Sequence, residues 1–504
     1  MAKALMIQGT GSGAGKSLIS TGLCRIFSRD MGLRVAPFKA QNMALNSYVT
    51  KEGGEIGRAQ ALQAEACGIE PSVYMNPILL KVSGRTGSQV IVLGKVHSTM
   101  SAKQYYEFKD EAWKAVVYAY EQLSRRYDLI VIEGAGSPAE INLYTKEIVN
   151  MAVARYLDCP VILVGDIDRG GVFASFYGTA ALVEDDAKYI KAFLINKFRG
   201  DKDILEPGNK MIEEKTKIPV IGVLPYIEDL RLSEEDGLVF NNPYFKSYNN
   251  KAHIKIAVLR LKYISNFTDF DPFLYEQDVE LVYTLSREDI LSADLLIIPG
   301  SKNTVKDLLL LRQSGVEESI AEAHRRGIPI IGICGGYQML SRTIQDPYCV
   351  ESDEKIVKGF GLLDTETIFD RQKTTCQLTA SYNVNSGFEL LSGCEFLGLT
   401  GYEIHLGQTI GETGVFTIWR QDSRSPISDG ASIENVLGTY IHGLFDNNRF
   451  RAKLINALLH KKGLTACDSF CVDYSSVKQQ SINLLADTIK ENIDMDFIIN
   501  LYRS

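Results

Sequence analysis

The segment ALMIQGTGSGAGKS, residues 4–17, decides the fold of the first half of the chain. Residues 4–8 form an apolar run of strand length, and four glycines alternate with small residues directly after it. Glycine lets a backbone curl so that its N–H groups point at a phosphate, and Lys16 and Ser17 can then reach the terminal phosphates and Mg²⁺. The predicted loop comprises Thr10, Gly11, Ser12, Gly13, Ala14, Gly15, Lys16 and Ser17, with Thr10 in place of the usual first glycine.

Short apolar runs alternate with helical patterns from this loop as far as residue 232. The runs are 33–38, 89–93, 129–133, 161–166, 192–196 and 220–224. This alternation predicts a parallel, doubly wound α/β sheet covered on both faces, with 1–232 as one domain. Residues 233–251 are polar and rich in Asn and Tyr, which predicts a linker. A second α/β pattern follows over 252–448, and 449–504 predicts a helical extension packed on that second domain.

Acidic side chains stand at or near the ends of several strands, where the carboxyl ends of a parallel sheet gather ligands. Glu133 ends the run 129–133 and is a candidate Mg²⁺ ligand, with a solvated strand-end acid as the alternative. Glu55, in GGEIGRAQ, is a second candidate metal ligand with the same alternative. At Asp166, Asp168 and Arg169 the acids can bind metal and the arginine a phosphate or a substrate carboxylate; the alternative is a structural salt bridge.

A second strand-to-helix turn carries a thiol. In GICGGYQ, residues 332–338, the small residues around Cys334 permit the sharp turn of a nucleophile elbow. The N–H of Gly335 is the expected oxyanion donor, and the turn at Gly300 is expected to supply the second. His442 is the expected partner base. His405 is the competing histidine and a candidate substrate contact, and a core or surface histidine is the alternative for both.

These motifs resemble two known families. The loop GT-x-S-x-x-GKS is similar to that of dethiobiotin synthetase-type ligases, which use ATP to activate a carboxylate. That resemblance implies that Lys39 lies near the phosphates and that Asn196 reads the adenine edge. The second half resembles the class I glutamine amidotransferases, which have a flavodoxin-like α/β fold and a Cys-His-Glu triad. The position of that Glu, two residues after His442, holds Leu444, which leaves open what orients His442.

Longer stretches resemble the cobyric acid synthases over nearly the whole chain. Among them are FKAQNMALNSY at 38–48, DIDRGGVFA at 166–174 and ISNFTDFD at 264–271. The resemblance implies a ligase that uses ATP and Mg²⁺, makes ammonia from L-glutamine, and amidates the b, d, e and g carboxylates of a corrinoid acid, adenosylcobyrinic acid a,c-diamide. The alternatives are cobyrinic acid a,c-diamide synthase or a cell-wall precursor amidase of the same branch, an ATPase switch of the ParA/MinD type, and a binding module without catalysis.

The composition favours a cytoplasmic protein and argues against a nucleic-acid or membrane partner. Lys and Arg number 54 against 62 Asp and Glu, and the resulting net charge of −8 argues against a nucleic-acid partner. No apolar run reaches the ~18–20 residues that span a bilayer, and the N-terminus lacks the apolar stretch of a signal peptide. Nine scattered cysteines without CxxC spacing fit a reducing compartment, and no obligatory protein partner is evident.

Overall fold

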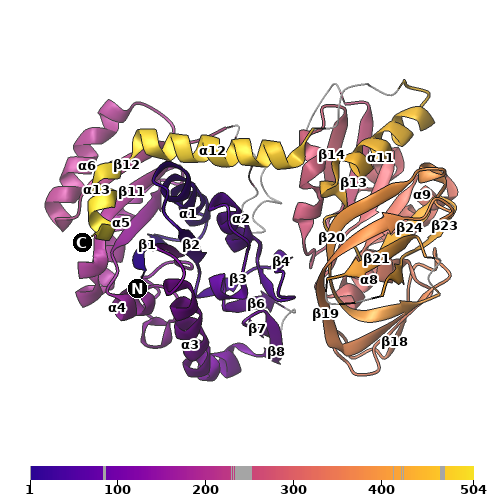
Figure 1. Ribbon diagram of the computed structural model, residues 1–504, viewed down its shortest axis with the longest axis horizontal. Helices are drawn as coiled ribbons and strands as arrows, with labels where there is room; N and C mark the ends of the chain where they lie inside the picture. The colour runs from indigo at the N-terminus through magenta and orange to yellow at the C-terminus, as the bar shows by residue number, and fades with distance from the viewer. Residues whose placement is uncertain are drawn as a thin grey trace.

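The computed structural model describes residues 2–82, 87–228, 230, 232, 252–411, 414–421, 423, 425–465 and 472–503. Two α/β domains lie side by side, and one long helix, α12 (Tyr474–Asn492), runs from one to the other (Figure 1). The predicted linker, 233–251, lies outside the described residues. Within the described part of the chain, no helix is both long and apolar enough to cross a membrane.

The N-terminal domain is built on a six-stranded sheet whose pairs are all parallel. In spatial order its strands are β12 (Val220–Pro225), β11 (Ile190–Phe198), β10 (Val161–Asp166), β1 (Lys3–Gly9), β9 (Leu129–Glu133) and β2 (Val35–Phe38). Side chains alternate between the faces, so Leu5 and Ile7 enter one apolar core and Met6 enters the other. This confirms the predicted doubly wound sheet.

Helices cover both faces of that sheet. The helices of the domain are α1 (Lys16–Arg25), α2 (Arg58–Ala66), α3 (Ala102–Ser124), α4 (Met151–Leu157), α5 (Val172–Leu182) and α6 (Lys202–Thr216). The longest, α3, begins with a capping box in which Ser101 and Gln104 satisfy each other's backbone N–H groups. Such caps explain why helix starts can be predicted from sequence.

One predicted strand of the main sheet belongs elsewhere. Residues 89–93 fall in β7, which pairs antiparallel with both of its neighbours in a separate four-stranded sheet. That sheet contains β3 (Gln41–Met43), β6 (Ile78–Val82), β7 (Ser88–Val92) and β8 (Lys95–Met100). The reason is the two-residue turn at Leu93 and Gly94, because positive φ at both positions closes a tight hairpin. Beside it lies the pair β4 (Ser47–Val49) and β5 (Glu55–Gly57).

The C-terminal domain has two sheets. The first is parallel except at its edge and consists of β14 (Val279–Thr284), β13 (Ile254–Leu259), β15 (Leu295–Ile298), β16 (Ile330–Ile333), β24 (Val436–Thr439) and β23 (Ala431–Ile433). Its helices include α7 (Arg287–Ser292), α8 (Thr304–Gln313), α9 (Val316–Arg325) and α10 (Gly335–Leu340). The second sheet contains β17 (Thr343–Gln345), β18 (Ile356–Lys358), β19 (Glu366–Tyr382), β20 (Phe396–Ile410), β21 (Phe416–Arg420) and β22 (Ile427–Asp429).

The C-terminal helices divide between the domains. The helix α11 (Asn448–Lys461) packs into the core of the C-terminal domain. The prediction is wrong for α12 and α13 (Met495–Arg503), which bury apolar residues in the core of the N-terminal domain. Gly22 of α1 allows this approach, since a Cβ there would stand 2.3 Å from the Ile489 side chain. The apolar spacing of these helices predicts a buried face but does not say which domain buries it.

Candidate active site

The phosphate loop adopts the predicted strand–loop–helix geometry. It joins β1 to α1, and Gly13 (φ 74°) and Gly15 (φ 98°) take the left-handed conformation that lets the chain curl. Among the described residues no side chain caps the first turn of α1. The Lys16 ammonium donates to the carbonyl oxygens of Gly11 (2.9 Å) and Gly136 (3.0 Å). The loop therefore presents helix N–H groups and a cation, as an anionic phosphate requires.

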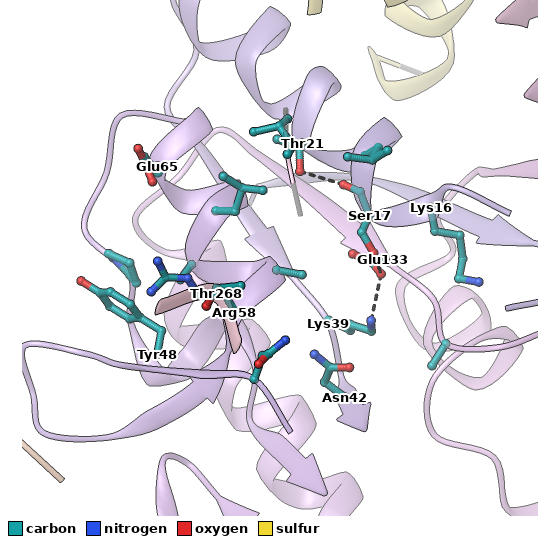
Figure 2. A pocket seen from close by; sticks show the side chains of 18 of the residues that line it. Lys16, Ser17, Thr21, Lys39, Asn42, Tyr48, Arg58, Glu65, Glu133 and Thr268 are labelled. Atoms are coloured by element: carbon teal, nitrogen blue, oxygen red, sulfur yellow. Dashed lines mark hydrogen bonds and ion pairs between the residues drawn. The ribbon is translucent and has the colours of Figure 1, made fainter. Parts of the chain in front are cut away.

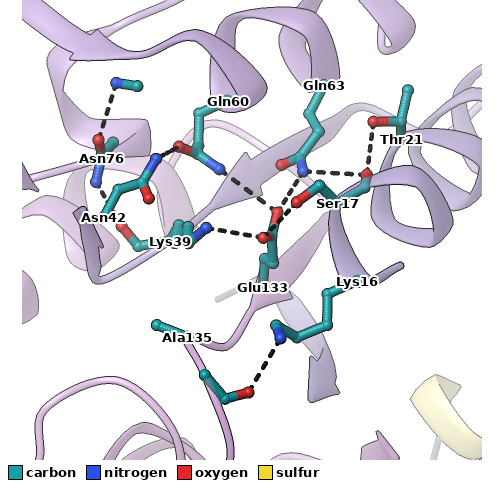
Figure 3. A network of polar contacts seen from close by, with 12 residues as sticks. Lys16, Ser17, Thr21, Lys39, Asn42, Gln60, Gln63, Asn76, Glu133 and Ala135 are labelled. Carbon is teal, nitrogen blue, oxygen red and sulfur yellow. Dashed lines mark hydrogen bonds and ion pairs between the residues drawn. The ribbon is translucent and has the colours of Figure 1, made fainter. Parts of the chain in front are cut away.

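Glu133 is the hub of a buried polar network at the end of β9 (Figure 3). Its carboxylate accepts from the Ser17 hydroxyl at 2.8 Å, the Lys39 ammonium at 2.9 Å and the Gln63 amide at 2.6 Å. Burial alone would raise the pKa of Glu133, but Lys39 and the other donors hold it below its usual value. An ionised carboxylate thus lies against the loop and beside the Lys39 side chain.

The donor set at Ser17 and Glu133 suits Mg²⁺. A hydroxyl and one carboxylate converge there, and Mg²⁺ in nucleotide sites typically takes few protein oxygens together with substrate phosphates and water. The described residues contain no group of three or more acidic, Cys or His side chains placed to hold a metal ion by themselves. A cation at this position would therefore depend on the phosphates for much of its coordination.

Asn196 and Arg169 also reach the phosphate loop. The Asn196 amide donates to the Ala14 carbonyl at 2.9 Å, and a Cβ at Gly13 would stand 3.0 Å from the Arg169 guanidinium. Asp166 lies 3.5 Å from Arg169 and 3.3 Å from Lys197. Lys197 is a residue of this site that the sequence analysis does not predict. Lys197 donates to the Gly13 carbonyl at 2.7 Å. Asp168 instead faces Arg199 at 3.6 Å in a half-exposed pair.

Glu55 does not join this site, so its prediction as a metal ligand is wrong. Its two carboxylate oxygens each lie 2.5 Å from an ammonium group, Lys81 of the same domain and Lys373 of the C-terminal domain. Burial opposes ionisation, but the two lysines hold the pKa of Glu55 well below its usual range. Two cations on one carboxylate repel a third, so Glu55 serves as a buried ion pair between the domains.

The thiol turn has the strained backbone of a nucleophile elbow. Cys334 lies between β16 and α10 with φ 52° and ψ −107°, a conformation that L residues rarely adopt. Its side chain is buried, and the sulfur is 3.6 Å from the Ile404 carbonyl. Gly335 packs against the Ser301 backbone nitrogen, and Gly300 packs against the His442 ring. The four residues predicted for this site, Cys334, Gly335, Gly300 and His442, therefore lie together.

An acid side chain contacts His442, although Leu444 stands at the sequence position of the usual triad Glu. Asp269 Oδ2 lies 2.6 Å from His442 Nδ1, and Asp269 Oδ1 accepts the Gly443 N–H at 3.2 Å. Burial lowers the pKa of His442, but Asp269 and Cys334 outweigh it and raise the pKa to about 10. Among the described residues, the buried Nε2 has no hydrogen-bond partner. Cys334, His442 and Asp269 therefore lie in one place as a candidate triad, with the acid supplied from a distant segment.

His442, not His405, is paired with the acid Asp269, and both ring nitrogens of His405 have neighbours within β20. The Nδ1 of His405 lies 3.0 Å from the Gly407 carbonyl and its Nε2 3.3 Å from Glu403, and its ring stacks on Tyr440. These contacts make it a structural histidine of β20. Its neighbour Tyr402 was not predicted but stacks on the His442 ring, with centroids 5.2 Å apart.

A cavity of about 1020 Å³ lies between the domains. Figure 2 shows Tyr48, Arg58 and Thr268 on one side of it and Lys39, Glu133 and Ser17 on the other. Gly401, Tyr402 and Gly443, which contact the triad histidine or its backbone, also line it. Its cationic residues are Lys16, Arg25, Lys39, Arg58, Lys109 and Lys478. The phosphate loop and the surroundings of the triad therefore border one space.

Comparisons with known proteins agree with both halves. A family model described as CobQ/CobB/MinD/ParA nucleotide binding domain matches residues 5–240, and one described as CobB/CobQ-like glutamine amidotransferase domain matches residues 255–450. A solved glutamine amidotransferase from Thermotoga maritima aligns with 50% of this chain and 99% of its own at 15% identity, but with a TM-score of only 0.27.

Full-length relatives are much closer. The cobyric acid synthase of Thermodesulfovibrio yellowstonii is 50% identical over 496 residues, which cover 98% of each chain. That of Clostridium tetani is 47% identical over 505 residues, covering 99% of this chain and 98% of the relative. With both family models matched in order along the sequence, these identities show that the chain belongs to the cobyric acid synthase family of ATP-dependent glutamine amidotransferases.

Proposed function

We propose that the chain amidates the b, d, e and g side-chain carboxylates of adenosylcobyrinic acid a,c-diamide, with ATP and glutamine, in cobalamin biosynthesis. The observation that carries the proposal is the single cavity bordered by the phosphate loop and by the residues around His442. A carboxylate activated at the loop and ammonia released beside His442 then meet in one space. The names of the full-length relatives favour this corrinoid substrate.

In the glutaminase half, the Cys334 thiol gives its proton to His442 Nε2, and the thiolate sulfur attacks the amide carbon of glutamine. The oxygen that becomes negative is stabilised by backbone N–H groups at Gly335 and at the Gly300 turn. His442 Nε2 gives a proton to the departing ammonia, and water then hydrolyses the thioester to glutamate. Asp269 holds Nδ1 and so keeps the imidazole in the orientation that this transfer needs.

In the ligase half, a substrate carboxylate oxygen attacks the γ-phosphorus of ATP, giving an acyl phosphate and ADP. The loop N–H groups and Lys16 stabilise the charge on the phosphates as the bond to ADP breaks. Mg²⁺ would be held by Ser17 and Glu133 and would neutralise phosphate charge when bound. Ammonia attacks the acyl carbon and phosphate leaves, because phosphate is a far better leaving group than hydroxide.

Arg58 is the side chain best placed to hold a substrate carboxylate. Its guanidinium stands 5.6 Å from the centre of the Tyr48 ring, in the cavity wall. Burial lowers the pKa of Arg58, but nearby acidic groups, Asp446 and Asp269 among them, interact with its charge and raise that pKa; among the described residues neither aspartate is in direct salt-bridge contact with it. Two of the cavity's acids are already paired, Glu133 with Lys39 and Glu65 with Lys478. A planar guanidinium binds a carboxylate with two parallel hydrogen bonds, which suits a polyanionic corrinoid.

The substrate is tested by offering the purified protein two corrinoid acids in separate reactions with ATP, Mg²⁺ and glutamine. With the a,c-diamide we expect carboxamides to accumulate, counted by mass spectrometry, together with ADP and glutamate. Cobyrinic acid, the substrate of the a,c-diamide synthase, should react poorly. A preference for cobyrinic acid, or product only with a cell-wall precursor, would refute the assignment in favour of a sister amidase.

A further inference from the structure

Two buried asparagines join the domains next to the triad acid. The Ser47 N–H of the N-terminal domain donates to Asn266 Oδ1 at 3.1 Å, and the Phe267 N–H of the C-terminal domain donates to Asn46 Oδ1 at 3.0 Å. Asn46, Ser47 and Asn266 are all buried. We name this reciprocal pair of Asn46 and Asn266 the asparagine clasp. Buried N–H groups lose free energy when unpaired, so the two backbones are held in register.

The clasp continues directly to the triad. Asn266 has φ 53° and ψ 40° and precedes the short helix η7 (Phe267–Tyr275). Its carbonyl accepts the Asp269 N–H at 3.0 Å. Asp269 in turn holds His442 Nδ1 at 2.6 Å. The position of the triad acid is therefore set by a turn whose first residue is bonded to the other domain.

The clasp also continues to the phosphate site. The Asn46 carbonyl accepts the N–H of Arg58, the first residue of α2, at 3.3 Å. From α2, Gln60 and Gln63 reach the Glu133 carboxylate at 3.5 and 2.6 Å (Figure 3). A continuous set of hydrogen bonds thus runs from the phosphate loop through α2 and the clasp to the triad acid.

We propose that Asn46 and Asn266 are positioning residues that make the alignment of Asp269 and His442 depend on the ligand state of the ATP and corrinoid cavity. The proposal rests on the two-site function given above. Ligands that bind at Arg58 or Glu133 contact α2 or its partners, and they shift the clasp if they favour one arrangement of α2 over another. Ammonia is then released efficiently only when an acceptor carboxylate is in place.

The sharpest test replaces Asn266, because Asn46 lines the cavity and the described cavity wall does not include Asn266. Asn266→Gly keeps the left-handed backbone and removes the acceptor oxygen, whereas Asn266→Asp keeps both. Asn435→Ala is the matched control, since Asn435 is a buried asparagine of the same domain that bonds the His324 and Ile328 carbonyls instead. Amidation with glutamine and with ammonium, and glutamate release with and without ATP, Mg²⁺ and corrinoid, are measured for each variant.

We expect Asn266→Gly to lower glutamine-dependent kcat ~10–100-fold with KM for glutamine within ~3-fold, because a misplaced orienting group slows chemistry more than binding. Ammonium-dependent amidation should stay within ~2-fold of the unchanged protein. The ligands should stimulate glutamate release in the unchanged protein and in Asn266→Asp, but not in Asn266→Gly. In Asn435→Ala, the ratio of the amidation rate with glutamine to the rate with ammonium should equal that of the unchanged protein.

Two results would overturn the proposal. One is an equal loss of glutamine-dependent and ammonium-dependent amidation in Asn266→Gly, which would indicate a purely structural effect. The other is stimulation of glutamate release by ATP, Mg²⁺ and corrinoid in Asn266→Gly to the same extent as in the unchanged protein. Failure of the two-site function itself is distinguishable, because the unchanged protein would then form no carboxamide from either nitrogen source.

Discussion

Replacing Asp269 by Asn tests the triad that the structure adds to the sequence pattern. Asn keeps the shape of the side chain but carries no charge and only one acceptor oxygen. If that oxygen continues to accept the Gly443 N–H, the amide NH2 faces His442 Nδ1, so the imidazole loses its charge partner and its Nδ1–H tautomer. The Asp269–His442 contact is 2.6 Å long and both groups are buried. Breaking a buried ion pair costs ~3–5 kcal/mol. A loss of ~3 kcal/mol in the transition state slows glutamine-dependent amidation ~10²-fold.

The assay compares the two nitrogen sources in the same preparation. Ammonium-dependent amidation needs only the ligase half and should remain near the unchanged rate, which also reports that the variant is folded. Glu403→Gln is the matched control, because it weakens another buried carboxylate–histidine contact, to His405, without touching His442. Glutamine-dependent activity of Asp269→Asn within ~3-fold of the unchanged protein would refute the triad, since that is under ~1 kcal/mol.

The pH profile gives an independent reading of the same contact. Asp269 and Cys334 raise the pKa of His442 to about 10 against the effect of burial. Removing the Asp269 charge lowers that pKa, so the pH above which glutamine hydrolysis declines should move to lower values. The raised pKa of His442 also makes folding stability depend on pH. The Asp269–His442 pair stabilises the fold fully below pH 6.5, the ordinary pKa of histidine, and this stabilisation is lost as the pH rises through about 10.

Two further predictions concern the ligase half and the domain contact. Lys16→Ala should abolish amidation from both nitrogen sources while glutamate release persists, because only the phosphoryl transfer needs this cation; product formed from ammonium at the unchanged rate would contradict the role of the loop. Lys373→Met removes one of the two cations on buried Glu55 but leaves Lys81, so it should lower the free energy of unfolding by about 2 kcal/mol, the contribution of one hydrogen bond to a charged group. An unchanged urea midpoint would show that this interdomain ion pair contributes nothing net.

Local motifs can be predicted from sequence because a few adjacent residues determine both their backbone geometry and their chemistry. The glycines of the phosphate loop, the turn at Cys334 and the strand end at Glu133 each require one backbone geometry within a short segment. The structure brings Ser17, Lys39 and Glu133 together at one strand edge, as a parallel sheet dictates. His442 followed from the need of a thiol for a base.

Long-range partners were not predictable in the same way. Asp269 lies 173 residues before His442. Its segment, ISNFTDFD, resembles the family in sequence, but the resemblance gives Asp269 no role. Sequence alone does not separate the alternatives for Glu55 and His405, because a buried acid or histidine looks the same in sequence whether it binds a ligand or a neighbouring side chain. The packing of α12 on the N-terminal domain and the clasp at Asn46 likewise depend on which surfaces meet after folding.

The most direct test of the two-site account is Cys334→Ser assayed for corrinoid carboxamide with glutamine and, separately, with ammonium. The thiol is needed only to release ammonia from glutamine, whereas activation of the carboxylate takes place at the phosphate loop. We predict no product with glutamine and near-unchanged product and ADP with ammonium. Loss of ammonium-dependent product in a folded variant, or retention of glutamine-dependent product, would contradict the account.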